Sequence, residues 1–142
     1  MNTFLDANIC LDLLDTKRPT SEASVAWYME KKDDVSLNFL FSSDFITTFY
    51  YILTEKRKYD EVKVIESIDA LSFEIRPFYL AHSDFVNAKS DFFSESFKDF
   101  EDLMVLNSAV RAECDVFMTN DKALLRLGVF KGMELLKVAQ ES

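Results

Sequence analysis

The chain contains few of the residues on which many common sites depend. Its 142 residues include two glycines, two prolines, two cysteines and one histidine. Two glycines are too few for a glycine-rich phosphate-binding loop, and one histidine excludes a metal site built from several histidines. Cys10 and Cys114 lack the CxxC spacing of zinc and redox motifs, so we expect both to be reduced thiols in apolar surroundings.

Positive charge is also scarce, because 16 Lys and Arg face 25 Asp and Glu, for a formal net charge of −9. That sign argues against a protein that coats nucleic acid by bulk charge, but not against an enzyme whose carboxylates bind a metal and act on a phosphodiester. No apolar run approaches the roughly 20 residues of a membrane span, and the start MNTFLD lacks a signal-peptide pattern. We therefore expect a cytoplasmic protein with no membrane association.

The order of apolar patterns predicts the fold class. Neither a repeat nor a change of composition divides the sequence, so residues 1–142 are expected to form one domain. Strands are predicted at 3–5, 35–41, 73–75, 116–118 and 133–138, and helical segments at 9–14, 20–29, 45–53, 60–71, 81–93, 99–113 and 122–127. This alternation predicts an α/β protein, a three-layer α/β/α sandwich around a mainly parallel sheet of four or five strands.

Two aspartates follow predicted strands. Asp6 comes directly after residues 3–5, and Asp121 follows residues 116–118 with Thr119 and Asn120 between. Parallel strands present their carboxyl ends at one edge of a sheet, where such folds bind ligands. If the two strands are neighbours, the carboxylates of Asp6 and Asp121 converge.

One predicted helix begins with three further acids, Asp99, Glu101 and Asp102. Taken alone, this pattern favours a structural role, with Asp99 as the N-cap and Asp102 near the positive end of the helix. Together with Asp6 and Asp121, however, these carboxylates would repel one another and need a cation to remain ionised. Mg²⁺ or Mn²⁺ suits such oxygen ligands, so the sequence predicts metal-assisted hydrolysis of a phosphodiester.

Three blocks resemble the PIN-domain ribonucleases, and most of all the VapC toxins of bacterial and archaeal toxin–antitoxin pairs: FLDANI at 4–9, FSSDFITTFYYIL at 41–53 and DFEDLMVLNSAVRAECDVFMTND at 99–121. The resemblance implies a Mg²⁺- or Mn²⁺-dependent endoribonuclease with a cognate antitoxin as its protein partner. It implies that Asp6, Asp102 and Asp121 bind the metal, with Asn8, Thr119 and Asn120 in supporting positions.

One position departs from the pattern of that family. A glutamate normally stands about six residues after the serine that opens the third helix, and counting from Ser42 that place is Thr48. Asp44 lies one turn earlier, about 6 Å along the helix axis, and could replace the glutamate in part, as could Asp99 or Glu101. The departure leaves a second hypothesis open, a PIN-like domain with weakened or lost catalysis that binds RNA or protein.

Basic and aromatic residues are the candidates for contacts with RNA and partner chains. A charge run is usually a solvated face, and RNA contact is the alternative for Lys56, Arg57, Lys58, Lys122, Arg126 and the pair Lys17 and Arg18. Most of the 14 Phe and 5 Tyr are expected in the core. The candidates for a homodimer interface or an antitoxin groove are Phe49, Tyr50, Tyr51, Phe92 and Phe93.

Two further interpretations carry less weight. His82 is expected to be an exposed residue at a helix start rather than a proton shuttle. A phosphatase of the haloacid dehalogenase type also has a first strand that ends in Asp, but that family requires a second aspartate where this chain has Asn8.

Overall fold

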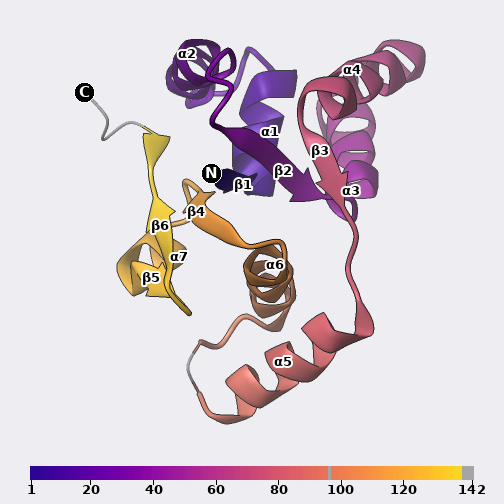
Figure 1. Cartoon of the computed structure of the whole chain (residues 1–142). Helices are drawn as coiled ribbons and strands as arrows, with labels where there is room; N and C mark the ends of the chain where they lie inside the picture. The colour runs from indigo at the N-terminus through magenta and orange to yellow at the C-terminus, as the bar shows by residue number, and fades with distance from the viewer. Residues whose placement is uncertain (96, 139–142) are drawn as a thin grey trace.

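The computed structural model describes residues 1–95 and 97–138 and shows helices on both faces of a central sheet (Figure 1). The strands are β1 (Asn2–Leu5), β2 (Asn38–Ser42), β3 (Arg76–Phe78), β4 (Cys114–Met118), β5 (Val129–Phe130) and β6 (Met133–Leu136). They lie in the order β3-β2-β1-β4-β6-β5. Every neighbouring pair is parallel except β5 and β6.

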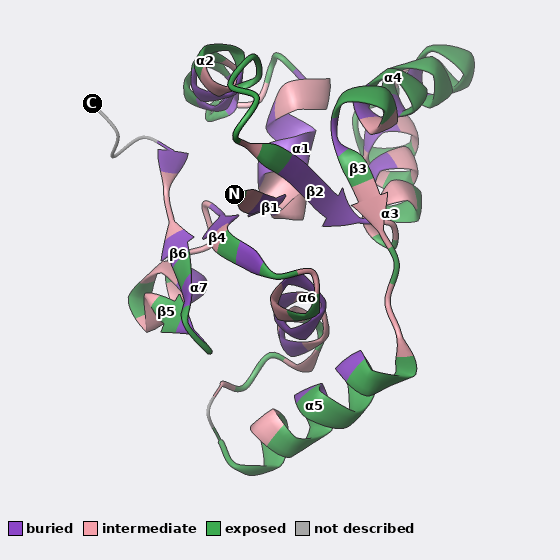
Figure 2. Ribbon diagram, in the orientation of Figure 1, coloured by how far each residue is buried: buried purple, intermediate pink, exposed green. Residues whose placement is uncertain are grey.

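Each face of the sheet is covered by its own set of helices. One set is α1 (Ala7–Leu14), α2 (Ser21–Lys31), α3 (Phe45–Tyr51) with a π-helical turn η1 (Ile52–Lys56), and α4 (Glu61–Glu74); the other is α5 (His82–Phe93), α6 (Phe100–Arg111) and α7 (Lys122–Leu127). Phe4 packs in the α6 core and Leu5 in the α1 core, as the two-residue period of a strand requires. Figure 2 shows the buried residues along the strands and the inner faces of the helices.

The predicted three-layer sandwich is confirmed, with six strands instead of four or five. The extra strand is the two-residue β5, which pairs antiparallel with β6. Gly128, with φ of 78°, directly precedes β5, and Gly132, with φ of 85°, stands in the turn between β5 and β6. Two residues carry too little hydrophobic pattern to indicate a strand in the sequence.

Two predicted strands were misplaced. The segment 73–75 is not a strand, because α4 continues to Glu74, Phe73 is 85% exposed and β3 begins only at Arg76. β3 contains Pro77, which is tolerated because β3 is an edge strand. β2 begins at Asn38 rather than at 35, and Val35 is fully exposed.

Two smaller predictions, on the cysteines and on His82, are confirmed. Cys10 and Cys114 are free and buried, and burial raises the pKa of both thiols, that of Cys114 to about 12. His82 is exposed at the start of α5. Among residues 1–95 and 97–138, no helix has the length and apolar character that a membrane span requires.

Candidate functional site

The carboxyl ends of β1 and β4 bring Asp6 and Asp121 to one edge of the sheet. The two strands are parallel neighbours, and the Asp6 backbone nitrogen donates to the Met118 carbonyl at 2.9 Å. Each aspartate then caps a helix: Asp6 Oδ1 accepts from the Ala7 nitrogen and Asp121 Oδ1 from the Ala123 nitrogen, both at 2.8 Å. The predicted convergence depended on these strands being neighbours, and they are.

Three polar residues tie the two aspartates together. Thr119 Oγ1 donates to Asp6 Oδ2 at 2.7 Å and accepts from the Asp121 backbone nitrogen at 3.0 Å. Asn8 Nδ2 donates to the same Asp6 oxygen at 3.3 Å, and Asn8 Oδ1 accepts from the Asn120 backbone nitrogen at 3.0 Å. The supporting residues predicted from the sequence therefore connect the N-terminus of α1 with the loop that carries Asp121.

Asp102 joins this edge from the first turn of α6. Its backbone nitrogen donates to the capping Asp99 Oδ1 at 3.1 Å, and its side chain is half-buried. Burial, with added repulsion from Asp99, Asp6 and Asp121, raises the pKa of Asp102 to about 7. Burial also raises the pKa of Asp6, and Asp121 adds to that effect, whereas the hydrogen bonds from Thr119 and Ala7 oppose it. The carboxylates therefore lie close enough to disfavour one another's charge.

A cleft of about 530 Å³ opens beside these acids. It is lined by Asp6, Ala7, Asp44, Phe45, Thr48, Leu80, Phe100, Glu101, Asp102, Met104 and Val105. Thr48, the position at which the resemblance predicts a glutamate, lines the cleft together with Asp44. Asp121 and Asp99 do not line the cleft. Thr119 connects Asp121 with Asp6, because it accepts from the Asp121 backbone nitrogen and donates to Asp6 Oδ2.

The carboxylate oxygens of Asp6, Asp102 and Asp121 fit a hard divalent cation, although they are not yet arranged as a complete set of metal ligands. Over residues 1–95 and 97–138, no three acidic, histidine or cysteine side chains already stand in the arrangement of a metal site. Carboxylate oxygens are nevertheless the ligands that Mg²⁺ and Mn²⁺ prefer. In the same part of the chain, no lysine or arginine forms an ion pair with Asp6, Asp102 or Asp121. The negative charge of the cleft is therefore not neutralised by the protein itself.

One residue that contacts the site was missed. Asp12 is fully buried in α1, and its Oδ2 accepts from Asn120 Nδ2 at 3.3 Å. The signal in the sequence was an acid in the middle of the apolar stretch Ile9–Leu14, where an unpaired charge would be unfavourable.

The predicted RNA contacts differ in their availability. Arg57 Nε donates to Asp15 Oδ2 at 2.9 Å and Arg18 Nε to Asp12 Oδ1 at 2.8 Å, so both guanidinium groups already bind buried acids. Lys17, Lys56, Lys58, Lys122 and Arg126 are exposed. Lys122 directly follows Asp121 and is the predicted basic residue nearest to the site in sequence.

The aromatic candidates for an interface also differ in how exposed their side chains are. Phe49 is fully buried between Phe41 and Phe45, so its predicted place in an interface or groove is wrong. The pattern of α3 alone could not distinguish its core-facing ring from its exposed ones. Tyr50 is half-buried, whereas Tyr51, Phe92 and Phe93 are 55%, 39% and 72% exposed.

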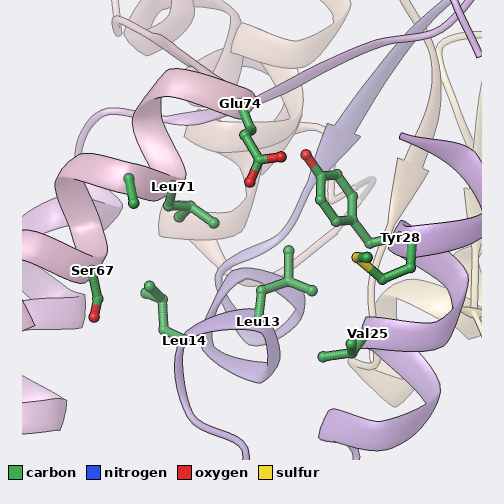
Figure 3. A pocket seen from close by; sticks show the side chains of 9 residues that line it. Leu13, Leu14, Val25, Tyr28, Ser67, Leu71 and Glu74 are labelled. Carbon is green, nitrogen blue, oxygen red and sulfur yellow. The ribbon is translucent and has the colours of Figure 1, made fainter. Parts of the chain in front are cut away.

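A second hollow, of about 300 Å³, lies between α1, α2 and α4 and has a different character (Figure 3). Its walls include Leu13, Leu14, Val25 and Leu71, and the Tyr28 hydroxyl and the Glu74 carboxylate point toward one another across it. Burial, with Glu74 and Asp33, raises the pKa of Tyr28 to about 12. One acid among apolar walls offers a contact surface and not a metal site.

Comparison with known proteins gives a family match and a sequence relative. The family model of the PIN domain matches residues 2–123. Ribonuclease VapC1 of Aquifex aeolicus (strain VF5) is 30% identical over 126 residues, which cover 84% of this chain and 81% of the relative.

Three solved structures share the fold. VapBC2 from Rickettsia felis, bound to a DNA fragment from its promoter, gives a TM-score of 0.72 at 11% identity over 96% of this chain and 98% of that one. VapC20 from Mycobacterium tuberculosis, a toxin that cleaves the sarcin-ricin loop, gives 0.69 at 12% identity over 93% and 98%. VapBC-1 from nontypeable Haemophilus influenzae gives 0.67 at 16% identity over 99% and 100%.

Proposed function

Because this chain belongs to the PIN domain family, we propose that it is a Mg²⁺- or Mn²⁺-dependent endoribonuclease, the toxin of a toxin–antitoxin pair. The observation that carries the proposal is the cleft in which Asp6 and Asp102 meet without a lysine or arginine partner in the described part of the chain. The family match and the 30% identity to a ribonuclease support the same chemistry. In this proposal residues 1–142 form one PIN domain that acts in the cytoplasm.

The acids have distinct roles in this proposal. Asp6, Asp102 and Asp121 would hold the ion, while Asp99 and Glu101 add negative charge nearby. When bound, the ion would position the phosphodiester, lower the pKa of a water molecule and stabilise the leaving oxygen. Thr119 and Asn8 orient Asp6 by donating to its Oδ2. Asn120 fixes the loop through its backbone bond to Asn8.

RNA reaches the acids along the cleft. Phe45 and Phe100 on its walls offer ring surface against which bases can stack. Lys122 supplies a phosphate contact beside the site, and Lys56 and Lys58 supply weaker contacts farther along the surface. Arg57 contributes less, since Asp15 already binds its guanidinium group.

A cognate antitoxin is the proposed protein partner. Two of the structural relatives are VapBC assemblies, and this chain matches them over 96% and 99% of its length. Tyr51, Phe92 and Phe93 leave aromatic surface in water, which suits burial against an antitoxin or a second copy of this chain.

The test is cleavage of RNA by the purified protein with and without Mn²⁺. We expect cleavage that requires the ion, and we expect Asp6→Asn to reduce the rate more than about 100-fold. Asp115→Asn is the control, because it removes the same charge from an exposed position in β4. Equal cleavage by Asp6→Asn and Asp115→Asn would refute the assignment of the site.

A second candidate function is supported by Thr48, which puts a neutral side chain on the cleft wall. A PIN domain with one ligand fewer would bind RNA or a protein partner without cutting RNA efficiently. The two candidates differ in one measurement: this one predicts RNA binding that persists in Asp6→Asn, and no ion-dependent cleavage by the natural chain.

A further inference from the structure

Asp12 has a more complete set of partners than any acid in the cleft. Its side chain is fully buried, and it accepts four hydrogen bonds: Oδ1 from Arg18 Nε at 2.8 Å and Thr20 Oγ1 at 2.6 Å, Oδ2 from Ser24 Oγ at 2.5 Å and Asn120 Nδ2 at 3.3 Å. A carboxylate has about four acceptor sites, so this one is saturated. A buried charge is stable only when it is bonded in this way.

One of the four partners comes from a distant part of the chain. Arg18, Thr20 and Ser24 belong to the α1–α2 connection and the start of α2, which follow Asp12 closely in sequence. Asn120 belongs to the loop between β4 and α7. Asp12 therefore fastens that loop to the middle of α1.

The fastened loop is the one that carries the site. Asn120 is held at two points, by its backbone nitrogen on Asn8 Oδ1 and by its amide on Asp12. Its neighbours are Thr119, which donates to Asp6, and Asp121. Since Asp6 caps α1 and Asn8 lies in its first turn, α1 is the common frame for both sides of the site.

We propose that Asp12 is a positioning residue that acts through Asn120: it sets the loop at residues 119–121 opposite Asp6 and so determines how tightly the cleft binds a divalent cation. The inference rests on the proposed function, because the cation belongs to that function. Asp12 itself does not line the cleft. Groups that hold metal ligands from behind typically change metal affinity 10- to 100-fold when they are removed.

Asp15 provides a matched control. It lies just beyond α1, is 3% exposed, and accepts from Arg57 Nε at 2.9 Å and the Tyr59 hydroxyl at 2.7 Å. It has the burial and the arginine partner of Asp12, but no bond between Asp15 and the loop at 119–121 is recorded among the described residues. The variant Asp15→Asn therefore shows how much Mn²⁺ binding changes when a buried acid with a purely structural role is lost.

The experiment measures Mn²⁺ binding by calorimetry for the natural chain, Asp12→Asn, Asn120→Ala, the double variant and Asp15→Asn. We expect the two single changes each to weaken binding about 10-fold, the double variant to be no more than about twofold weaker than either, and Asp15→Asn to match the natural chain. Asn120 is only half-buried, so Asn120→Ala keeps the test possible even if Asp12→Asn does not fold. Unchanged affinity in Asn120→Ala, multiplicative effects, or equal weakening in Asp15→Asn would each overturn the proposal.

A second readout separates this inference from the proposed function. Hydrogen exchange of the Asn120 backbone amide, measured without metal, should accelerate at least about 10-fold in Asp12→Asn and stay unchanged in Asp15→Asn. If the natural chain binds no Mn²⁺, the metal-dependent function fails, while faster exchange still supports the positioning of the loop. Unchanged exchange in Asp12→Asn overturns the positioning role whatever the ion does.

Discussion

Buried carboxylates at two places in this protein are compensated in opposite ways. Those outside the cleft pair with arginine: Asp12 with Arg18 at 2.8 Å, Asp15 with Arg57 at 2.9 Å and Asp84 with Arg111 at 3.0 Å. In the cleft, Asp6 accepts hydrogen bonds only from neutral groups, and no ion pair of Asp6 or Asp102 is recorded in the described part of the chain.

The pKa shifts show what this difference means. Burial opposes the charge of Asp15, but bonds from Tyr59, Lys17 and Arg57 outweigh it, and the pKa of Asp15 is lowered. Asp102 experiences burial and like charges together, and its pKa rises to about 7. At Asp15, where the fold supplies its own cation, the charged form of the acid is favoured. In the cleft, where the fold supplies no lysine or arginine partner, the acids are available to a cation from solution. The lack of such a partner is what marks the cleft as a candidate metal site.

The largest expected effect on the free energy of unfolding comes from removing the arginine that pairs with a buried acid. Arg111 makes its ion pair with Asp84, donates to the Tyr79 carbonyl and lies 4.4 Å from the centre of the Phe78 ring. The Asp84 side chain is 1% exposed, and without Arg111 only the Ala81 backbone nitrogen, at 2.8 Å from Oδ2, is recorded as its partner in the described part of the chain. Arg111→Met therefore leaves a buried charge without a cation, and we expect a loss of about 3 kcal/mol in the free energy of unfolding.

Urea denaturation at pH 7 measures that loss. The matched control is Arg126→Met, which removes an exposed arginine from α7 and should change the free energy of unfolding by less than about 0.5 kcal/mol. If the two variants lose the same amount, pairing with arginine is not what stabilises the acids outside the cleft.

The second prediction concerns the addition of Mn²⁺, a cation that can neutralise the carboxylates of the cleft. A cation that binds only the folded state adds about 2.7 kcal/mol to the free energy of unfolding when its concentration is 100 times its dissociation constant. We expect Mn²⁺ to stabilise the natural chain and Asp115→Asn equally, because Asp115 is exposed and away from the cleft. Asp102→Asn should gain clearly less. Thermal denaturation with and without Mn²⁺ measures the gain, and an equal gain in Asp102→Asn would remove Asp102 from the site.

The third prediction concerns the unpaired acid in the absence of metal. The pKa of Asp102 is about 7 in the folded protein against an ordinary value of 3.8, so the folded state binds this proton more tightly than the unfolded state does. The resulting stability is fully present below pH 3.8 and is lost as the pH rises through 7. At pH 8 and without metal, Asp102→Asn should therefore be more stable than the natural chain by about 1–2 kcal/mol, after allowance for solvent screening of a half-buried group.

Denaturation at pH 8 and pH 4 measures this difference. The gain of Asp102→Asn should shrink toward zero at pH 4, where the natural carboxyl is also neutral. A gain that is the same at both pH values would point to altered packing and not to an uncompensated charge.

The sequence predicted the features that depend on local rules. Asp99 caps α6 with its side chain, as predicted for an aspartate before an apolar helical pattern. The convergence of Asp6 with Asp121 required only that β1 and β4 be neighbours in a parallel sheet.

The features that escaped prediction depend on contacts between distant residues. Arg57 is part of a basic run in the sequence, and only the fold shows that Asp15, 42 positions away, binds it. Asp12 reads as an isolated acid until its bond to Asn120, 108 positions away, is known. The end of α4 was misjudged because Phe73 is apolar yet exposed, so its side chain gave a strand pattern that burial does not support. Local propensity carries no information on such pairs.

The smallest expected effect comes from adding one more acid to the cleft. Thr48 is exposed on the cleft wall, so Thr48→Glu places a fifth carboxylate beside Asp6, Asp44, Glu101 and Asp102. Without metal, repulsion at this exposed position should lower the free energy of unfolding by less than about 1 kcal/mol.

The same change should strengthen Mn²⁺ binding by up to about 10-fold, because a cation removes the repulsion that the new carboxylate adds. Thr47→Glu is the control, since Thr47 is the exposed neighbour on α3 and does not line the cleft. Calorimetry measures the binding, and cleavage of RNA should rise with it. If Thr48→Glu and Thr47→Glu bind Mn²⁺ alike, the natural chain already has the ligands that it needs. The absence of a carboxylate at position 48 then does not weaken the metal site.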